Sequence, residues 1–350
     1  MIDVGLIGFG LAGRYFHAPV IRAVPGLRLA AIVQRTADSA ANAFPDARIV
    51  RSVDELLAIG SIRLVVIATP NQTHFSLAKK CLEAGRDVVV DKPFVTTLAE
   101  AVTLLELAKK RGRILTVYHN RRFDADFQSL RRVAADGELG RIVRFESTYD
   151  RFRPSAKPGA WREKPEPGSG VLFDLAPHLI DQSLTLLGRP EAISGDVRIE
   201  REGFATDDAF DVMLYYLHGV RSLLRATMLA LTLRPRLVVL GTKGTFLKKD
   251  FDPLENSLRN GIVPKGESWV LEREENWGEL TRIEDGQSRQ MKVPPKGDWR
   301  EFYANVRDAI LGRAALLVTP QQVLDVMVAL ELVLESSGKR RAVAWRDIEV

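Results

Sequence analysis

Lys92 is the residue that most directly indicates chemistry in this chain, because it ends a short apolar strand between an acid and a proline. The run Val88–Val90 is β-branched, as expected of a strand buried on both faces of a parallel sheet. Pro93 cannot donate to a sheet and restricts the preceding residue to extended geometry, so Lys92 is confined. A confined ammonium can polarise a hydroxyl or carbonyl oxygen. The alternative is a surface lysine that merely ends a strand.

Asp174 and His178 form a second candidate pair, after the glycine-rich stretch 168–170. On a helix, residues four apart share a face. An imidazole beside a carboxylate is a common proton-transfer unit, because histidine titrates near neutrality and the acid can set its tautomer. Pro177 fits only the first turn, so we expect the helix to start near Asp174. The alternatives are a structural hydrogen bond and a metal site; we expect no metal, because only Asp181 lies nearby, without a His or Cys cluster.

Gly8, Gly10 and Gly13 form a complete G-x-G-x-x-G between a predicted strand and a predicted helix. In dinucleotide-binding folds the three glycines serve a tight turn, close approach to the pyrophosphate and helix packing. The helix N-terminus adds free N–H groups and partial positive charge. The pattern predicts a dinucleotide site; the alternative is a glycine-rich turn without a ligand.

The end of the second predicted strand indicates which dinucleotide fits. An NAD site usually carries Asp or Glu there, but this strand ends at Val33-Gln34-Arg35-Thr36 without an acid. Arg35 can pair with a 2′-phosphate through its planar guanidinium, and Thr36 can donate to it. The sequence therefore favours NADP. The alternative is a solvent-facing Arg35 in a site that also accepts NAD.

An α/β fold accounts for the placement of these residues. Residues 1–120 alternate predicted strands and helices, which indicates a doubly wound parallel sheet of the Rossmann type. The carboxyl ends of such strands meet at one edge, where ligands bind. The predicted strands are 2–7, 29–33, 64–68, 88–90 and 114–118, and the predicted helices are 14–24, 52 onward, 73–84 and 98–111.

Residues 121–350 are predicted to form a second, α+β domain. Its strands alternate polar and apolar residues, as in a large, mainly antiparallel sheet with unlike faces. Its helices are too few to cover both faces, so we expect the outer face to join copies of the chain. The predicted strands are 141–149, 192–199, 210–216, 222–229 and 236–240, the predicted helices are 126–135, 299–311 and 320–337, and residues 250–297 are predicted loops with a short hairpin.

The composition is that of an ordinary globular protein. The 350 residues suffice for two domains, and the net charge of +5 comes from 50 Lys+Arg against 45 Asp+Glu spread along the chain, which is not a nucleic-acid footprint. No apolar run reaches the roughly 20 residues of a membrane span, and no secretory signal is readable. The single cysteine, Cys81, fits a reducing compartment, so we expect a cytoplasmic location.

Residues that could contact a substrate follow the last Rossmann strand and open the second domain. Asn120 stands in Tyr118-His119-Asn120-Arg121-Arg122, at the carboxyl edge of the sheet, where it could face a ligand; the alternative is an ordinary basic turn. Tyr149 and Arg151, and later Trp161 and Arg162, mix aromatic rings with hydrogen-bonding groups. That mixture suits a polyol or sugar, which offers hydroxyls on its rim and C–H bonds on its faces.

Together these motifs resemble the glucose–fructose oxidoreductase/inositol dehydrogenase (Gfo/Idh/MocA) family over essentially the whole chain. The glycine loop matches its dinucleotide motif, Asp91-Lys92-Pro93 matches its Glu-Lys-Pro, and Asp174 with His178 matches its D-x-x-x-H. Segments 16–19, 118–122 and 161–164 are most similar to the NADP-dependent scyllo-inositol dehydrogenases. Two departures are that Asp91 is one methylene shorter than Glu, and that residues 168–170 only loosely replace the usual glycine run.

The resemblance implies reversible hydride transfer between NADP(H) and a ring carbon of a cyclic polyol or sugar, in a homodimer or homotetramer. It implies a catalytic set in which His178 exchanges the hydroxyl proton, Asp174 orients His178 or relays the proton, and Lys92 stabilises the alkoxide. The predicted cofactor-binding residues are Gly8, Phe9, Gly10, Leu11, Gly13, Arg35, Thr36, Thr69, Pro70, Asn71, His74, Asp91 and Lys92, and the predicted substrate-binding residues are Asn120, Tyr149, Arg151, Trp161 and Arg162.

Two other functions fit the same fold. Some members of the family bind the dinucleotide and regulate transcription, and such a sensor does not need Lys92, Asp174 and His178, which this chain keeps. The second is a bilin or imine reductase. Reduced-nicotinamide absorbance measured with polyols, sugars and imines separates all three.

Overall fold

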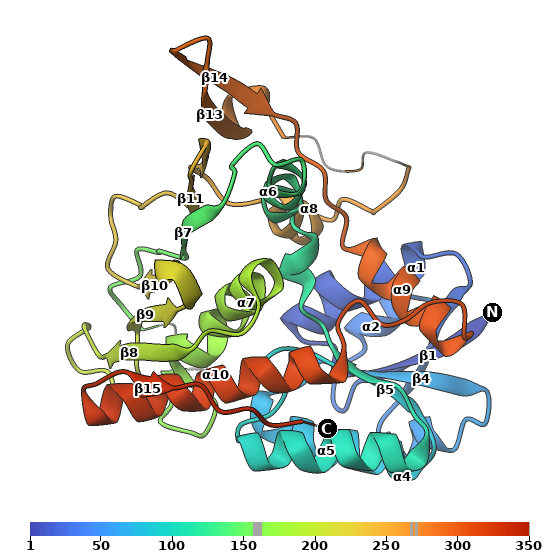
Figure 1. Cartoon of the computed structure of the whole chain (residues 1–350). Coiled ribbons are helices and arrows are strands. Elements are labelled where there is room, and N and C mark those ends of the chain that lie inside the picture. The colour runs from blue at the N-terminus through green and yellow to red at the C-terminus, as the bar shows by residue number, and fades with distance from the viewer. Residues whose placement is uncertain (157–162, 267–268, 270–271, 350) are drawn as a thin grey trace.

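A computed structural model describes residues 1–156, 163–266, 269 and 272–349. Figure 1 shows a smaller sheet built from the N-terminal part of the chain and a larger sheet built from the later part, with helices packed against both. Trp161 and Arg162, predicted to contact a substrate, lie outside the described residues.

The N-terminal sheet is the predicted doubly wound parallel sheet. Its strands are β1 (Ile2–Ile7), β2 (Leu27–Val33), β3 (Arg48–Val50), β4 (Ile62–Ile67), β5 (Asp87–Val90) and β6 (Leu115–Val117). Their order, β3-β2-β1-β4-β5-β6, is that of a Rossmann fold, and every pairing is parallel. β1 and β5 are buried throughout, as expected when helices cover both faces.

The helices of this part lie where the sequence predicted them, except that α2 was not predicted. They are η1 (Gly13–His17), α1 (Ala18–Ala23), α2 (Ser39–Ala43), α3 (Val53–Leu57), η2 (Asn71–Thr73), α4 (His74–Glu83) and α5 (Leu98–Arg111). Ser52 caps α3 as predicted, since its hydroxyl accepts from Glu55 N at 3.1 Å. α2 and β3 were not predicted, because five and three residues carry too little periodicity.

The second sheet has nine strands in the order β14-β13-β12-β11-β7-β10-β9-β8-β15. All pairings are antiparallel except that of β7 with β10, which confirms the mainly antiparallel prediction. The strands are β7 (Ile142–Thr148), β8 (Ala192–Arg198), β9 (Ala209–Tyr215), β10 (Arg221–Thr227), β11 (Leu237–Gly241), β12 (Gly244–Lys248), β13 (Gly278–Glu284), β14 (Gln287–Val293) and β15 (Val343–Ala344).

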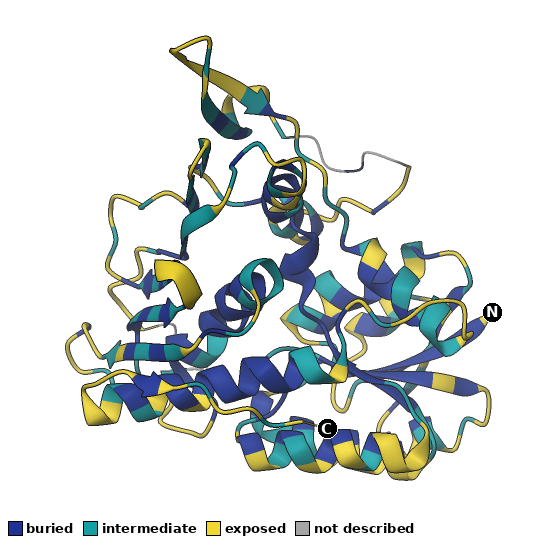
Figure 2. Ribbon diagram, viewed as in Figure 1, coloured by how far each residue is buried: buried dark blue, intermediate teal, exposed yellow. Residues whose placement is uncertain are grey.

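The helices of the second part are η3 (Asn120–Phe123), α6 (Ala125–Ala135), α7 (Gly170–Leu187), η5 (Leu217–Gly219), α8 (Leu254–Arg259), η6 (Glu274–Asn276), α9 (Arg300–Ile310) and α10 (Pro320–Lys339). Of these helices, α6, α7 and α10 pack against this sheet. α7 and α10 are largely buried, whereas the hairpin of β13 and β14 projects from the body and its strand β14 is mostly exposed (Figure 2). That hairpin was predicted; α8 was not, because its six residues stand in a segment rich in Pro, Gly and charge.

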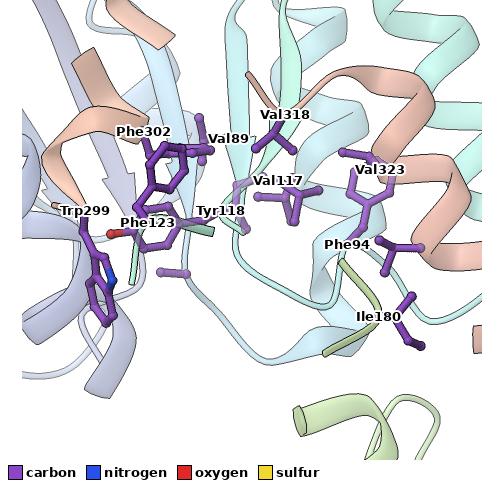
Figure 3. Close-up of a cluster of buried hydrophobic side chains, with 14 of the residues drawn as sticks. Val89, Phe94, Val117, Tyr118, Phe123, Ile180, Trp299, Phe302, Val318 and Val323 are labelled. Atoms are coloured by element: carbon purple, nitrogen blue, oxygen red, sulfur yellow. The ribbon is translucent and has the colours of Figure 1, made fainter. Parts of the chain in front are cut away.

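The last two long helices connect the two sheets. α10 packs against β8 and α7 and also against α5 and β6, and α9 packs against α1. Figure 3 shows the resulting core, in which Trp299 and Phe302 meet Tyr118, while Val318 and Val323 approach Val117. This core contains residues from both parts of the chain. The predicted domain boundary at residue 120 stays a prediction. Among the described helices, none has both the length and the apolarity to span a membrane.

We expect the chain to form homodimers or homotetramers through the outer face of the second sheet. Leu223 of β10 stands opposite Met213 of β9 on that face, and both are half-buried although no helix of the described chain covers them. Leu223→Glu should therefore weaken association, because a carboxylate would be buried at the contact.

Sedimentation velocity at micromolar concentration measures this outcome. Leu217→Glu, at an exposed turn in η5, is the matched control and should associate like the wild type. A wild-type protein that sediments as a monomer would contradict the prediction.

Candidate active site

A cavity of about 630 Å³ lies at the carboxyl edge of the N-terminal sheet, where a doubly wound fold binds its ligand. Its wall combines the glycine loop after β1 with the segments that follow β2, β4 and β5. Most predicted cofactor-binding residues line it, namely Gly8, Phe9, Gly10, Leu11, Arg35, Thr36, Thr69, Pro70, Asn71, Asp91 and Lys92.

The three positions of the loop carry glycine for different physical reasons. Gly8 has φ +98°, and a Cβ there would lie 2.5 Å from Ala68 O. A Cβ on Gly13 would lie 2.1 Å from Gly8 O, so this glycine serves the packing of helix against strand. A Cβ on Gly10 would meet nothing within 4 Å, so protein packing does not require a glycine there. The open space beside Gly10 fits the close approach of a pyrophosphate.

Two arginines, Arg35 and Arg51, lie at the end of the cavity that is lined by the segments following β2 and β3. Arg35 and Thr36 are exposed and line it, as predicted. Arg51 also lines it but was not predicted, because it follows a three-residue strand with too little pattern to be recognised. Asp38, the first acid after β2, pairs with Arg51 at 2.5 Å and is not among the lining residues. This end of the cavity is therefore suited to an anionic group.

Lys92 joins the cavity to the second part of the chain. It lines the cavity, and its Nζ donates to the main-chain oxygen of Asp174 at 2.5 Å and to Asp174 Oδ1 at 3.1 Å. Only 13% of its side chain is exposed, so the ammonium is confined as the sequence predicted. The structure thus brings Lys92 of the first sheet and Asp174 of α7 into direct contact.

Pro177 lies inside α7, which begins at Gly170, so the predicted helix start near Asp174 is wrong. A proline has no N–H and cannot donate to the carbonyl four residues earlier, which is that of Phe173. Lys92 donates to the next carbonyl along the helix, that of Asp174. The ammonium therefore meets α7 one residue beyond the carbonyl that Pro177 leaves without its helical donor.

Asp174 does not orient His178 as the spacing suggested. Its carboxylate pairs with Lys92 and lies 3.6 Å from Arg151 Nη1, and within the described chain no hydrogen bond joins it to His178. The two residues share a helix face, but cations from other segments attract a carboxylate more strongly than a neutral imidazole does. The catalytic role predicted for Asp174 stays a prediction, with Lys92 and Arg151 as the partners of its carboxylate in the structure.

His178 is buried, with 6% of its surface exposed. Burial, followed by the charges of Lys92 and Arg121, lowers its pKa well below 6.5. The imidazole is therefore neutral at pH 7, which corrects the expectation that it titrates near neutrality. Its Nδ1 has no hydrogen-bond partner among the described residues. A neutral imidazole is in the form that can accept a proton.

The predicted substrate-binding residues divide into three groups. Arg151 lies beside Asp174, and its guanidinium carbon is 5.0 Å from the centroid of the Tyr149 ring. Asn120 is buried in the short helix η3. Trp161 and Arg162 lie outside the described residues. The structure therefore brings Arg151 and Tyr149 to the group formed by Lys92 and Asp174.

Two contacts that the sequence did not indicate hold the loop before α7. Asn71 Nδ2 donates to Gly168 O at 2.7 Å, which ties the cavity wall to this loop. The carboxylate of Asp207 accepts from Leu172 N at 2.6 Å at the start of α7. Gly170 has φ +85°, and a Cβ there would lie 2.0 Å from Asp207 Oδ1. Asp207 precedes β9, far from α7 in sequence, so no local pattern could have revealed it.

His74 and Gly13 are the two predicted cofactor-binding residues that do not line the cavity. His74 is fully buried, with Nδ1 3.0 Å from Pro93 O and Nε2 2.9 Å from Thr69 O. It thus links the segments after β4 and β5 behind the cavity wall, and its role is structural. In the described ranges no group of three His, Cys, Asp or Glu side chains is arranged to hold a metal ion.

Comparison with known proteins places this site in a recognised context. Residues 2–119 match the family model described as "Oxidoreductase family, NAD-binding Rossmann fold", and residues 127–247 match the "GFO/IDH/MocA C-terminal domain". The chain is 42% identical to the uncharacterised oxidoreductase YdgJ of Escherichia coli, with 97% of each chain covered.

Two further relatives come from Bacillus subtilis. The chain is 33% identical to the scyllo-inositol 2-dehydrogenase (NADP(+)) IolW, covering 98% of this chain and 95% of the relative. The solved structure of the putative oxidoreductase yvaA superposes with a TM-score of 0.94 at 32% identity, covering 99% of this chain and 98% of that one. The similarity thus spans both sheets.

We expect His178 to contribute a loss in the free energy of unfolding as the pH is lowered from about 7.5 to about 5.5. Burial lowers the pKa of His178 well below 6.5 and that of His119 to about 4, so these two side chains bind fewer protons in the native state than in the unfolded state below pH 6.5. Their contribution to stability therefore rises with pH in this range, whereas buried acids with a raised pKa, such as Asp124 (about 7) and Asp207 (about 6), contribute with the opposite sign. Each histidine that stays neutral costs about 1.4 kcal/mol one pH unit below its unfolded pKa.

Urea unfolding at several pH values measures this dependence. His178→Asn should reduce the loss, whereas His218→Asn, at an exposed turn, should keep the wild-type dependence. An equal loss in all three proteins would show that His178 is not held neutral by the fold.

Proposed function

Because the chain belongs to the GFO/IDH/MocA family of oxidoreductases, we propose that it transfers a hydride between NADP(H) and a ring carbon of a cyclic polyol or sugar. The observation that carries this proposal is the position of Lys92, which lines the dinucleotide cavity and also contacts Asp174 of α7. A substrate beside Lys92 would lie between the coenzyme and the second part of the chain.

The residues of the cavity fit a dinucleotide with a 2′-phosphate. The open space at Gly10 accommodates a pyrophosphate, and Arg35 with Arg51 provides two guanidinium groups at the far end. An acid at the end of β2 would bind a ribose 2′-hydroxyl and repel a phosphate, but the lining residues there are basic or neutral. The NADP-dependent relative IolW agrees with this preference.

The roles proposed for the reacting residues follow from their contacts and charges. The coenzyme would supply or accept the hydride, and the protein orients the reactants and moves the proton. Lys92 holds a positive charge where the substrate oxygen develops negative charge. His178, neutral at pH 7, accepts the hydroxyl proton in oxidation and returns it in reduction. Asp174 holds Lys92 and Arg151 in place through its carboxylate.

The proposed substrate class rests on the groups beside Asp174. Arg151 offers hydrogen-bond donors, and the ring of Tyr149, which the Arg151 guanidinium covers, adds an aromatic surface. Such a surface suits the alternating hydroxyl and C–H groups of a cyclic polyol. The name of IolW, a scyllo-inositol 2-dehydrogenase, makes inositols the first compounds to test.

NADP should bind more tightly than NAD, and Arg35→Ala should remove the difference. Losing a charge-assisted pair with the 2′-phosphate should raise the dissociation constant for NADP about tenfold or more and leave that for NAD unchanged. Arg51→Ala should have the same direction and a smaller effect, because Arg51 also pairs with Asp38.

Isothermal titration with both coenzymes measures these constants. Arg48→Ala removes the same charge from an exposed position of β3 outside the cavity lining and is the matched control. Equal NADP affinity in wild type and Arg35→Ala would overturn the assignment.

Lys92→Ala, Asp174→Asn and His178→Ala should each lower turnover strongly. Loss of a group that moves a proton or stabilises the alkoxide typically costs roughly 10²–10⁴ in rate. NADP binding should stay nearly intact in the Asp174 and His178 variants, because neither residue lines the dinucleotide cavity. His218→Ala, at an exposed turn, is the control.

The assay is reduced-nicotinamide absorbance with a panel of inositol isomers, aldoses and imines and with each coenzyme. Near wild-type turnover of His178→Ala on the best substrate would reject the proton-transfer role. Tight coenzyme binding without turnover of any compound would favour a sensor.

A further inference from the structure

His17 is fully buried beneath the coenzyme cavity, on the π-helical turn η1 that follows the glycine loop. π-helical turns inside helices occur frequently at functional sites. The His17 ring lies 4.4 Å from the ring of Tyr118 and 6.2 Å from that of Tyr303. Tyr118 in turn packs against Trp299 and Phe302 (Figure 3). The catalytic scheme above leaves this histidine without a role.

The two ring nitrogens of His17 face different partners. Nδ1 lies 2.5 Å from the hydroxyl of Tyr303, which comes from α9. Nε2 lies 3.7 Å from Asp91 Oδ2, an ion-pair distance slightly longer than a direct hydrogen bond. His17 therefore stands between a residue of the C-terminal part of the chain and a carboxylate that lines the coenzyme cavity.

The Tyr303 hydroxyl and the Asp91 carboxylate together favour a proton on Nε2 of His17. Burial raises the pKa of Tyr303 well above 10, so the phenol keeps its proton and can donate to Nδ1. When Nδ1 accepts, the proton of a neutral imidazole is on Nε2 and points toward Asp91. With the opposite tautomer, the Nε2 lone pair would face the carboxylate and repel it.

Asp91 needs a nearby donor or cation more than an exposed acid would, because burial disfavours its charged form. Burial opposes its ionisation, but the polar N–H of His17 and the charge of Lys92 hold the pKa of Asp91 below its ordinary value. Its Oδ1 accepts from Lys92 N at 2.8 Å, so Oδ2 is the oxygen that faces His17. His17 Nε2 has no hydrogen-bond partner among the described residues, so it acts on Oδ2 across the 3.7 Å gap and limits the orientations that the carboxylate can take.

We propose that His17, with Nδ1 held by the Tyr303 hydroxyl, is a positioning residue that holds the Asp91 carboxylate in the orientation in which it binds the coenzyme. The inference rests on the proposed function, because it requires that the cavity binds NADP(H). It assigns the motif Phe16-His17-Ala18-Pro19 a role in coenzyme binding. It also makes that binding depend on α9, a helix more than 200 residues from the glycine loop.

The test is a double-mutant cycle on the dissociation constant for NADPH, followed by its fluorescence. Tyr303→Phe removes one hydroxyl from a buried ring and should raise the constant about three- to tenfold, as expected for one lost hydrogen bond. In an Asp91→Asn background the same change should have no further effect, because His17 acts through the carboxylate. If Tyr303 only supported the fold, the fold-changes that the two substitutions cause in the dissociation constant would multiply in the double variant.

Two His17 variants separate donation from packing. His17→Gln retains an amide N–H near the place of Nε2–H and should bind NADPH more tightly than His17→Leu, which has no donor. Tyr216→Phe removes a buried tyrosine hydroxyl that lies 2.9 Å from Ser183 Oγ, far from the cavity, and should leave binding unchanged. Thermal unfolding of each variant verifies that it is folded.

The outcomes are distinct. Coupled effects of Tyr303→Phe and Asp91→Asn, with partial rescue by Gln at position 17, would support the proposal. Independent effects, or wild-type binding by Tyr303→Phe and His17→Leu, would overturn it and leave the proposed function intact. Failure of the wild type to bind NADPH or NADH would overturn both.

Discussion

The contact of the Lys92 ammonium with Asp174 of α7 is the interaction on which the candidate site depends. Lys92 follows the fully buried strand β5, and its Nζ donates to both the main-chain oxygen and the carboxylate of Asp174. A confined ammonium needs acceptors, and Asp174 supplies both a carbonyl and a carboxylate. This contact joins the cavity wall to α7, between two sheets that α9 and α10 already connect.

Burial gives the groups around this contact opposite protonation states. His178 is neutral because it is desolvated and faces cations, chiefly Lys92 and Arg121. Asp91 is charged, although it is buried, because the polar N–H of His17 and the charge of Lys92 compensate its charge. A neutral base and a fixed charge within one site are what proton exchange beside a coenzyme requires.

The basic turn after β6 connects the N-terminal sheet to α7 and to the segment before α10. Arg122 makes two hydrogen bonds to Asp181 of α7, at 2.7 and 2.6 Å, and also donates to Leu317 O before α10. Both residues of the pair are almost completely buried, so removal of one partner would strand the other charge. The nearest acid to His178 in the sequence, Asp181, is therefore occupied by a buried ion pair with Arg122.

The sequence by itself determined the features whose causes are local. The glycine loop, the buried valine strand ending at Lys92, and the Ser52 cap each depend on a backbone conformation that a few neighbouring residues impose. The tertiary structure alone decided the partner of Asp174, the neutral state of His178 and the place of Arg51 in the cavity. These depend on contacts such as that of Lys92 with Asp174, 82 positions apart, and on burial, which no local pattern measures because it is set by the packing of the whole chain.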